Sequence, residues 1–407
     1  MSKIFNFKRN ERNTVEDVEK KILTFSFFER LVMNTGSTII GPIIPIVAVE
    51  LAIGLDYVGS VISIGAIALL VTSICTGFLL ELFGFKKIIL IGELLYIAGC
   101  LGLIFSNLYI TFAVSYTILK LGSGTISVAT MSLVGNHKDK SRSIMISNIG
   151  FTAGSVIAPL LVSLMFYTEA RWQVLFFIVI IPQILLIFSL IFLKMPSRSN
   201  TTESFKSMIN VNKSVISHPY IILCCIVSFL YNSTTQTFYT WFTSYFSTMN
   251  IELGLSSLIL AAYAASLLVG MFIKNHLVKY IEEKDLLLVS IFLSFVFLLL
   301  AFFVSNIIAK IILIFLFGIN ISGNFSLTFS MGLNVGTQFA NVVSGLVHAA
   351  SNLGVIVFQF LIGYLSESIS KNSVLYIDLT LLFFLTIIIA FMNKREFKYL
   401  GKDTNTI

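Results

Sequence analysis

Charged side chains are scarce in this sequence. Of its 407 residues, 57% are hydrophobic and only 12% are charged, whereas soluble domains contain about 25% charged residues. A helix needs about 20 predominantly apolar residues to cross a bilayer, and long apolar runs fill this chain. The composition therefore excludes a soluble globular protein and predicts an all-α integral membrane protein.

The chain also lacks the sequence patterns of catalytic and metal-binding proteins. It has no histidine pair with zinc-ligand spacing, no Gly-x-Ser-x-Gly and no Walker loop. The four cysteines lie inside apolar runs without metal spacing, and we interpret them as small apolar side chains: Cys75, Cys100, Cys224 and Cys225. We therefore expect no enzyme activity, no metal, no cofactor and no ATP-driven transport.

Twelve apolar runs are long enough to span a membrane. The predicted helices cover residues 23–50, 58–80, 88–106, 109–134, 143–166, 172–194, 219–247, 253–273, 286–305, 311–333, 342–366 and 374–392. The first 22 residues are polar and basic and lack an apolar core followed by small residues, so no cleaved signal peptide is expected.

The basic residues predict the orientation. With the N-terminus inside, 22 of the 27 lysines and arginines lie in cytoplasmic segments, and only Arg171, Lys310 and Lys371 lie outside. This bias has the sign of the positive-inside rule and predicts a cell-membrane protein with both termini cytoplasmic. The net charge of +7 is thereby explained without a nucleic-acid partner. Arg30 and Lys120 are left at membrane depth.

The twelve predicted helices fall into two related halves. A polar stretch over 195–217 separates them, and Ser147-Asn148-Ile149-Gly150 recurs 204 residues later as Ser351-Asn352-Leu353-Gly354. We predict two pseudo-symmetric six-helix bundles, with the boundaries 1–22 cytoplasmic segment, 23–194 N-terminal bundle, 195–217 cytoplasmic linker, 218–393 C-terminal bundle and 394–407 cytoplasmic tail.

A polar turn follows the second predicted helix. Its sequence fits the pattern Gly-x-Leu-x-acid-x-x-Gly-x-basic-basic, through Gly77, Leu79, Glu81, Gly84, Lys86 and Lys87. This turn resembles the signature loop between helices 2 and 3 of the major facilitator superfamily, although Glu81 stands where the family usually has Asp and Leu82 where it has Arg. The fifth helix contains Gly150, Gly154 and Pro159, similar to a glycine–proline motif of that family. Small residues at this spacing favour close helix packing.

The resemblance implies a monomeric transporter with the major facilitator fold, in which two bundles rock about a central substrate site. A weaker resemblance to the fucose–hexose:proton symporter branch rests on Gly122-Ser123-Gly124, Gly318–Gly323 and Tyr239-Thr240-Trp241. In the superfamily, the acid of the 2–3 turn meets the positive N-terminal end of helix 11. We therefore expect Glu81 to bias the equilibrium between two states.

Substrate-binding candidates follow from the helices that line the central cavity in this family, namely helices 1, 4, 7 and 10. The polar and aromatic side chains there are Arg30, Asn34, Lys120, Gln236, Tyr239, Trp241, Asn320 and Asn324. Amide and aromatic groups suit a hydroxyl-bearing solute, and the two cations favour a negative charge. Alternatively, Lys120 forms an ion pair with Glu93 or Glu29, Arg30 snorkels to the surface, and the polar face of helix 10 packs against other helices.

The coupling site is harder to predict. Ser127 stands where the fucose-type symporters carry a proton-binding acid. Glu29 or Glu93 could substitute, or the protein could be a facilitator; for Glu93, pairing with a basic residue is the other interpretation. His348 and Asp378 are interpreted as interfacial residues.

The function predicted from the sequence is secondary active or facilitative transport of a small polar organic solute, such as a sugar, sugar acid or carboxylate. Its partners are this small-molecule substrate, the lipid bilayer and, in the coupled case, a co-transported proton. A multidrug/proton antiporter is the alternative, and a non-transporting receptor of the same fold is a remote one.

Overall fold

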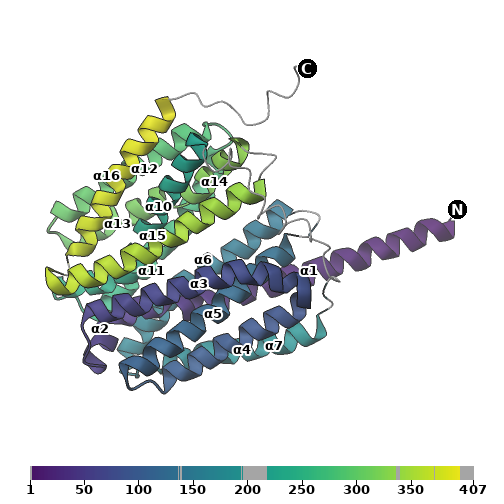
Figure 1. Cartoon of the computed structure of the whole chain (residues 1–407), viewed down its shortest axis with the longest axis horizontal. Coiled ribbons are helices and arrows are strands. Elements are labelled where there is room, and N and C mark those ends of the chain that lie inside the picture. The colour runs from purple at the N-terminus through teal and green to yellow at the C-terminus, as the bar shows by residue number, and fades with distance from the viewer. Residues whose placement is uncertain are drawn as a thin grey trace. The chain divides into compact units, whose positions relative to one another are not determined.

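The computed structural model describes residues 2–135, 137, 140–193, 195, 218–335, 340–370 and 372–394. All regular secondary structure in these residues is helical, and Figure 1 shows the arrangement. The elements are α1 (Ser2–Thr38), α2 (Ile40–Glu50), α3 (Leu55–Phe83), α4 (Phe85–Ile104), α5 (Tyr109–Val134), α6 (Lys140–Tyr167), α7 (Val174–Phe192), α10 (Pro219–Phe246), η1 (Ser247–Met249), α11 (Leu253–Leu277), α12 (Glu283–Phe303), α13 (Ile307–Ile321), α14 (Asn324–Val335), α15 (Ala340–Ser368) and α16 (Ser373–Lys394).

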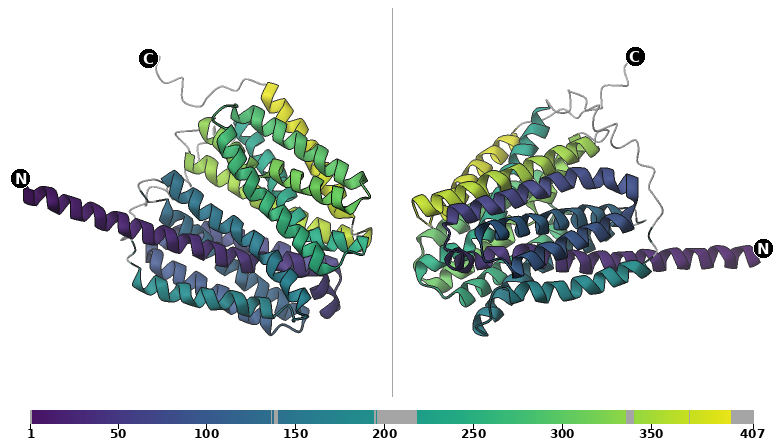
Figure 2. Two further views of the ribbon diagram at one scale, coloured as in Figure 1. Left: turned by 180° about the vertical axis from the view of Figure 1, so that it is seen from behind. Right: turned by 60° about the horizontal axis from the view of Figure 1, so that its bottom comes forward.

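Twelve helical segments of the described chain are long and apolar enough to span a membrane, which confirms the predicted number. Two of these spans are interrupted. The first, Asp17–Glu50, contains the C-terminal part of α1 and all of α2, and the tenth, Ile307–Gly332, contains α13 and most of α14. Figure 2 shows that α1 continues on its N-terminal side beyond the helices packed against it, because the helix already begins at Ser2 rather than near residue 23.

The chain forms two compact units. The N-terminal unit comprises Met1–Thr38, Val71–Ala158 and Arg171–Asn200, and the C-terminal unit comprises Ile39–Leu70, Pro159–Ala170 and Thr201–Ile407. The predicted domain boundaries stay a prediction. Of the predicted linker and tail, only Met195 and Lys394 lie among the described residues.

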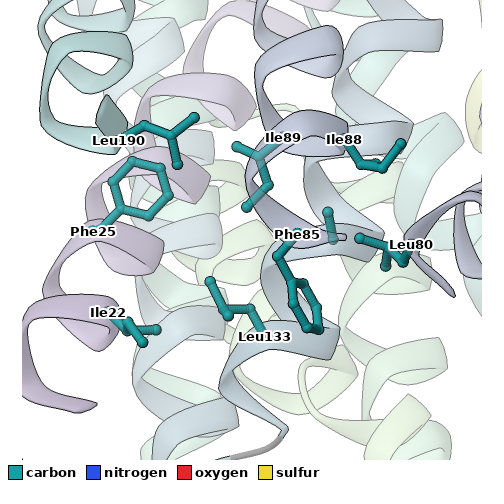
Figure 3. Close-up of a cluster of buried hydrophobic side chains, with 9 residues drawn as sticks. Ile22, Phe25, Leu80, Phe85, Ile88, Ile89, Leu133 and Leu190 are labelled. Carbon is teal, nitrogen blue, oxygen red and sulfur yellow. The ribbon is translucent and has the colours of Figure 1, made fainter. Parts of the chain in front are cut away.

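A cluster of buried apolar side chains lies at one end of the N-terminal unit (Figure 3). Five helices contribute to it, α1, α3, α4, α5 and α7, through Ile22, Phe25, Leu80, Phe85, Ile88, Ile89, Ala129, Leu133 and Leu190. Lipid tails are as apolar as these side chains, so close packing rather than escape from water stabilises such contacts in a membrane.

Within each unit, a glycine lets two neighbouring helices pack closely. A Cβ on Gly150 of α6 would meet the carbonyl oxygen of Phe27 in α1, and a Cβ on Gly354 of α15 would meet the carbonyl oxygen of Phe229 in α10. The two contacts occupy matching positions in the sequence repeat. The same backbone packing thus occurs once in each unit, as expected for a duplicated bundle.

Candidate functional site

Arg30 lies between three helices of the N-terminal unit. Its side chain leaves α1 and donates from Nη2 to Asn148 Oδ1 at 3.1 Å and from Nη1 to the Ser127 carbonyl oxygen at 3.4 Å. The guanidinium carbon lies 4.9 Å from the centre of the Phe151 ring. Arg30 is 5% exposed, and its Nε has no hydrogen-bond partner among the described residues. The side chain is therefore held between helices instead of reaching toward a surface.

Lys120 of α5 reaches the same helix, α1. Its Nζ donates to the Ser37 carbonyl oxygen at 3.1 Å and lies 5.2 Å from the centre of the Tyr116 ring. Within the described part of the chain, Lys120 forms no ion pair with Glu29 or Glu93. The structure therefore does not show the alternative ion pair of Lys120. All described partners of Lys120 and Arg30 are neutral.

Asn34 lies one helical turn beyond Arg30 and binds α6. Its Nδ2 donates to the Phe151 carbonyl oxygen at 2.6 Å and to Ser155 Oγ at 2.8 Å. A Cβ on Gly154 would contact Asn34 and the Leu31 carbonyl oxygen. Asn34 thus links α1 to α6 at the glycine-mediated contact, and Pro159 follows in the same helix.

Glu29 and Glu93 form a buried pair of carboxyl groups. Glu29 comes from α1 and Glu93 from α4; both are fully buried and close to one another, and neither Glu93 oxygen has a hydrogen-bond partner among the described residues. Gln183 of α7 donates from Nε2 to Glu29 Oε1 at 2.6 Å. No basic side chain among the described residues accompanies them, contrary to the predicted pairing of Glu93 with a lysine or arginine. Two buried carboxyl groups so close together repel one another when both are ionised, which favours a proton on one of them.

The aromatic candidates of α10 pack against α15. Trp241 is fully buried and donates from Nε1 to Gln359 Oε1 at 2.7 Å, and the Gln359 amide donates in turn to the Gln236 carbonyl oxygen and to Thr240 Oγ1. Tyr239 is buried, whereas the side chain of Gln236 is exposed. Gln359 of α15 thus fixes the position of Trp241.

The tenth span is bent where a continuous polar helix was expected. Helix α13 ends at Ile321, Gly323 has a φ of 72°, and α14 starts at Asn324. Asn320 donates from Nδ2 to the Leu316 carbonyl oxygen at 2.8 Å, and Asn324 is 1% exposed. For Asn324 the structure therefore favours the packing interpretation over an open polar face.

Asp378 and His348 were both expected at the membrane interface, and the structure places them differently. Asp378 is fully buried rather than interfacial, and it accepts a hydrogen bond from Thr237 Oγ1 at 2.9 Å. Its Oδ2 has no partner among the described residues. His348 is exposed, with the rings of Phe325 and Phe329 at 5.1 and 5.3 Å.

The predicted switch turn lies between α3 and α4. Gly84 has a φ of 79° and a Cβ there would meet nothing within 4 Å, so glycine is needed for the bend and not for packing. Lys86 donates to the Ile191 carbonyl oxygen at 2.6 Å, Lys87 is exposed, and Gly77 has open space beside it. The side chain of Glu81 lies outside the described residues.

A contact at the other end of α3 joins it to α15 within the C-terminal unit. The backbone N–H of Leu55, the first residue of α3, donates to Glu367 Oε2 at 2.8 Å. Gly59 and Gly363 cross backbone to backbone along the same contact, and Ser63 Oγ donates to the Ile356 carbonyl oxygen at 3.0 Å. Here an acid of α15 meets the N-terminus of α3, the reverse of the contact expected for Glu81.

These features define a multi-pass membrane protein of the transporter class, with charged groups held between helices. The family model described as Major Facilitator Superfamily matches residues 27–358. The chain therefore belongs to the Major Facilitator Superfamily, a family of transporters rather than enzymes, as the turn after α3 predicted.

Sequence relatives are distant. A "Protein TsgA homolog" of Buchnera aphidicola subsp. Baizongia pistaciae (strain Bp) is 26% identical over 221 residues, 52% of this chain and 55% of the relative. A second "Protein TsgA homolog", of Buchnera aphidicola subsp. Schizaphis graminum (strain Sg), is 20% identical over 264 residues, 64% of this chain and 67% of the relative. The chain thus spans between about half and two thirds of the curated relatives it matches.

Solved transporters share the fold over nearly the whole chain. A D-xylose-proton symporter superposes with a TM-score of 0.75 at 11% identity, covering 91% of this chain and 96% of the symporter. The nucleoside transporter NupG gives 0.74 at 14% identity, with 93% and 100% covered. A bacterial homolog of the human lysosomal transporter Spinster, inward-facing and occupied, gives 0.72 at 14% identity, with 93% and 96% covered. At these identities the likeness establishes the fold alone.

Proposed function

We propose that this protein is a proton-coupled secondary transporter of a small polar organic solute that carries a negative charge, such as a sugar acid or another carboxylate. The observation that carries the proposal is the pair of cations on α1 and α5, Arg30 and Lys120, whose described partners are all neutral. A cation at membrane depth costs about 2.5–3.5 kcal/mol on insertion scales and needs water, a counter-ion or a substrate.

The spacing of the two cations suits a small ligand. Arg30 contacts Ser127 of α5, and Lys120 contacts Ser37 of α1, so the two contacts are seven residues apart on each helix. Seven residues rise by about 10 Å in an α-helix. A solute of monosaccharide size with a carboxylate at one end could bind the guanidinium, which has a free donor, and approach the ammonium with its hydroxyl groups.

Proton coupling is assigned to the Glu29–Glu93 pair. Two carboxylates in contact repel one another when both are ionised, so such a pair retains a proton that it releases when its surroundings change. Glu29 precedes Arg30 on α1, and each side chain contacts different helices. Movement of α1 on substrate binding would therefore disturb the carboxyl pair directly.

We assign a part in alternating access to the acidic residues at the two ends of α3. At the described end, Glu367 accepts a hydrogen bond from the Leu55 N–H and stabilises the N-terminus of α3. The family resemblance predicts that Glu81, near the other end of α3, meets the N-terminus of a helix in one of the two transport states. A charge–dipole contact stabilises each state by about 0.3–1 kcal/mol, which is enough to bias a rocking equilibrium without locking it.

The test is a thermal-shift screen of the purified full-length protein, because a ligand that binds the native state raises its melting temperature. Sugar acids and carboxylates should stabilise the wild-type protein, and Lys120→Ala should remove that shift. Lys87→Ala, which removes an exposed lysine of the switch turn, is the matched control and should retain it. Retention of the full shift by Lys120→Ala would contradict the proposal.

A multidrug/proton antiporter is the second candidate. The Glu29–Glu93 pair favours it, because the pair has no basic partner among the described residues and such acids attract lipophilic cations. Arg30 and Lys120 oppose such a ligand. If cationic dyes stabilise the protein and expression raises resistance to them, while carboxylates do neither, the antiporter is the correct function. The expected location is the cell membrane, with both termini cytoplasmic and the protein acting as a monomer.

A further inference from the structure

The bend in the tenth span exposes backbone carbonyl groups inside the C-terminal unit. Helix α13 ends at Ile321, Ser322 is extended with a ψ of 147°, and Gly323 has a φ of 72° that favours glycine. The last carbonyls of a helix have no partner in the helix itself. In a membrane such groups must be satisfied by other parts of the protein.

Lys274 of α11 satisfies them. Its Nζ donates to the carbonyl oxygens of Asn320 and Ser322 and to Asn324 Oδ1. An ammonium group has three donors, so these three oxygens use all of them. Lys274 is only 7% exposed, although its position near the end of α11 suggested a cytoplasmic lysine.

The three oxygens are held in place independently of the lysine. Asn324 Oδ1 also accepts from Ser290 Oγ of α12 at 3.2 Å, and Asn324 Nδ2 donates to the Asn320 carbonyl oxygen at 3.2 Å. Ser322 Oγ donates to the Leu267 carbonyl oxygen in α11 at 2.5 Å. Four helices, α11, α12, α13 and α14, thus preorganise a cluster of neutral oxygens around one positive charge.

Carbonyl and amide oxygens at a broken membrane helix are the usual ligands of monovalent cations in transporters and channels. The described part of the chain places no carboxylate on Lys274, so the oxygens alone stabilise the charge. We propose that the bend between α13 and α14 is a monovalent-cation site, formed by the Asn320 and Ser322 carbonyl oxygens and Asn324 Oδ1, in which the ammonium of Lys274 is the resident cation.

This site holds the two halves of the tenth span in their bent arrangement. Removal of the ammonium leaves three oxygens that face one another without a donor. A small external cation, such as ammonium, methylammonium or sodium, can then bind in its place. The tethered cation also explains how the bend is stabilised without dissolved sodium. The inference does not depend on the substrate or on proton coupling.

The test compares variants of the purified full-length protein in salts of equal ionic strength. Wild-type protein should melt at the same temperature in choline, sodium, ammonium and methylammonium chloride. Lys274→Ala should melt lower in choline, which is too large for the site, and should regain at least half of the loss in one of the small cations. Lys279→Ala, which removes an exposed lysine just beyond α11, should match the wild type in every salt.

Two further variants separate the charge from the volume of the side chain. Lys274→Met fills the space without a charge and should be destabilised and insensitive to the salt. Asn324→Ala removes one oxygen while the lysine stays, and it should also be destabilised without a salt effect.

The proposal is overturned if Lys274→Met is as stable as the wild type, or if Lys274→Ala is no more stable in small cations than in choline. If Lys274→Ala folds only when purified in ammonium or methylammonium, the site is supported. If it folds in no salt, the site is rejected.

Discussion

The two glycine-mediated helix contacts have the same backbone packing, but the polar side chains beside them differ. In the N-terminal unit, Gly150 packs on α1 beside Arg30, which binds Asn148. In the C-terminal unit, Gly354 packs on α10 beside Asn232, whose amide donates to the Ser351 carbonyl oxygen at 3.3 Å. Asn232 occupies the position that Arg30 holds in the other repeat. The duplication preserved the packing, whereas the charge is found on one side only.

The buried titratable side chains also differ between the two units. The N-terminal unit holds two acids in mutual contact and two cations with neutral partners. In the described part of the C-terminal unit, the Lys274 ammonium has all of its donors in use, buried Lys310 donates to the Tyr245 hydroxyl at 3.2 Å, and Asp378 is bound by Thr237 through one carboxyl oxygen. Groups whose hydrogen-bonding capacity is unused are available to a substrate or a proton. Lys310 and Asp378 each occur with one described hydrogen-bond partner, whereas the N-terminal unit brings two such cations and two acids onto neighbouring helices, so we expect binding and coupling there.

The largest expected effect tests whether the two contacts are equivalent in packing. Gly150→Leu and Gly354→Leu each force a side chain against a carbonyl oxygen of the neighbouring helix, at a cost at or above the about 1–3 kcal/mol of ordinary overpacking. Both variants should lose the folded, monodisperse protein in size-exclusion chromatography. Gly77→Ala should not, because nothing lies beside Gly77. If Gly150→Leu or Gly354→Leu stays well folded, the helix contact at that glycine is not needed for folding.

The next effect tests whether the contacts differ in function. Arg30→Ala removes a charged donor. It should weaken binding of the ligand found in the thermal-shift screen about 10- to 100-fold, since hydrogen bonds to charged groups are worth about 1.5–3 kcal/mol. Asn232→Ala removes a neutral donor at the matching position and should weaken it far less. Titration of the melting temperature against ligand concentration measures both. Equal losses would mean that the two repeats share the binding.

Much of the fold could be predicted from the sequence, because span length and hydropathy are local properties. Twelve spans, the turn at Gly84 and the repeat that contains Gly150 and Gly354 all follow from composition and spacing. The bend at Gly323 had a visible signal, since polar residues alternate around that glycine, but it was interpreted as a continuous helix.

The site was only partly predictable. Helices 1 and 4 were expected to present Arg30 and Lys120, yet the contact of Glu29 with Glu93 depends on how α1 faces α4 and α7. Lys274 was counted as a cytoplasmic charge because the span was expected to end one residue before it. Whether a charge near a helix end turns inward depends on oxygens that another helix supplies, and one sequence does not specify them.

A smaller effect concerns the acid of the C-terminal unit. Asp378 is buried with one hydroxyl donor and no described cation, so its carboxyl group is expected to be neutral. Asp378→Asn keeps the acceptor for Thr237 and should change stability by less than about 1 kcal/mol. Asp378→Leu, which leaves the Thr237 hydroxyl without this acceptor, should cost more. Denaturation curves of both variants measure the change in stability. A large loss of stability in Asp378→Asn would mean that the protein requires an ionised Asp378.

The smallest effect concerns the contact between α3 and α15. Glu367→Gln removes the charge at the N-terminus of α3 and should shift the two-state equilibrium by about 0.3–1 kcal/mol, or up to about fivefold. A cysteine in place of buried Ser63, in a variant without the native cysteines, should then react faster with a maleimide. Glu252→Gln changes an exposed acid and should leave the rate unchanged. An unaltered rate in Glu367→Gln would exclude the contact as a switch.

The direct test of the central claim is transport by Glu93→Gln in reconstituted vesicles. If the N-terminal carboxyl pair couples protons to the solute, this variant should exchange labelled solute across the membrane but should not accumulate it when a proton gradient is imposed, while Asp378→Asn should do both. Accumulation by Glu93→Gln at the wild-type level would contradict the claim.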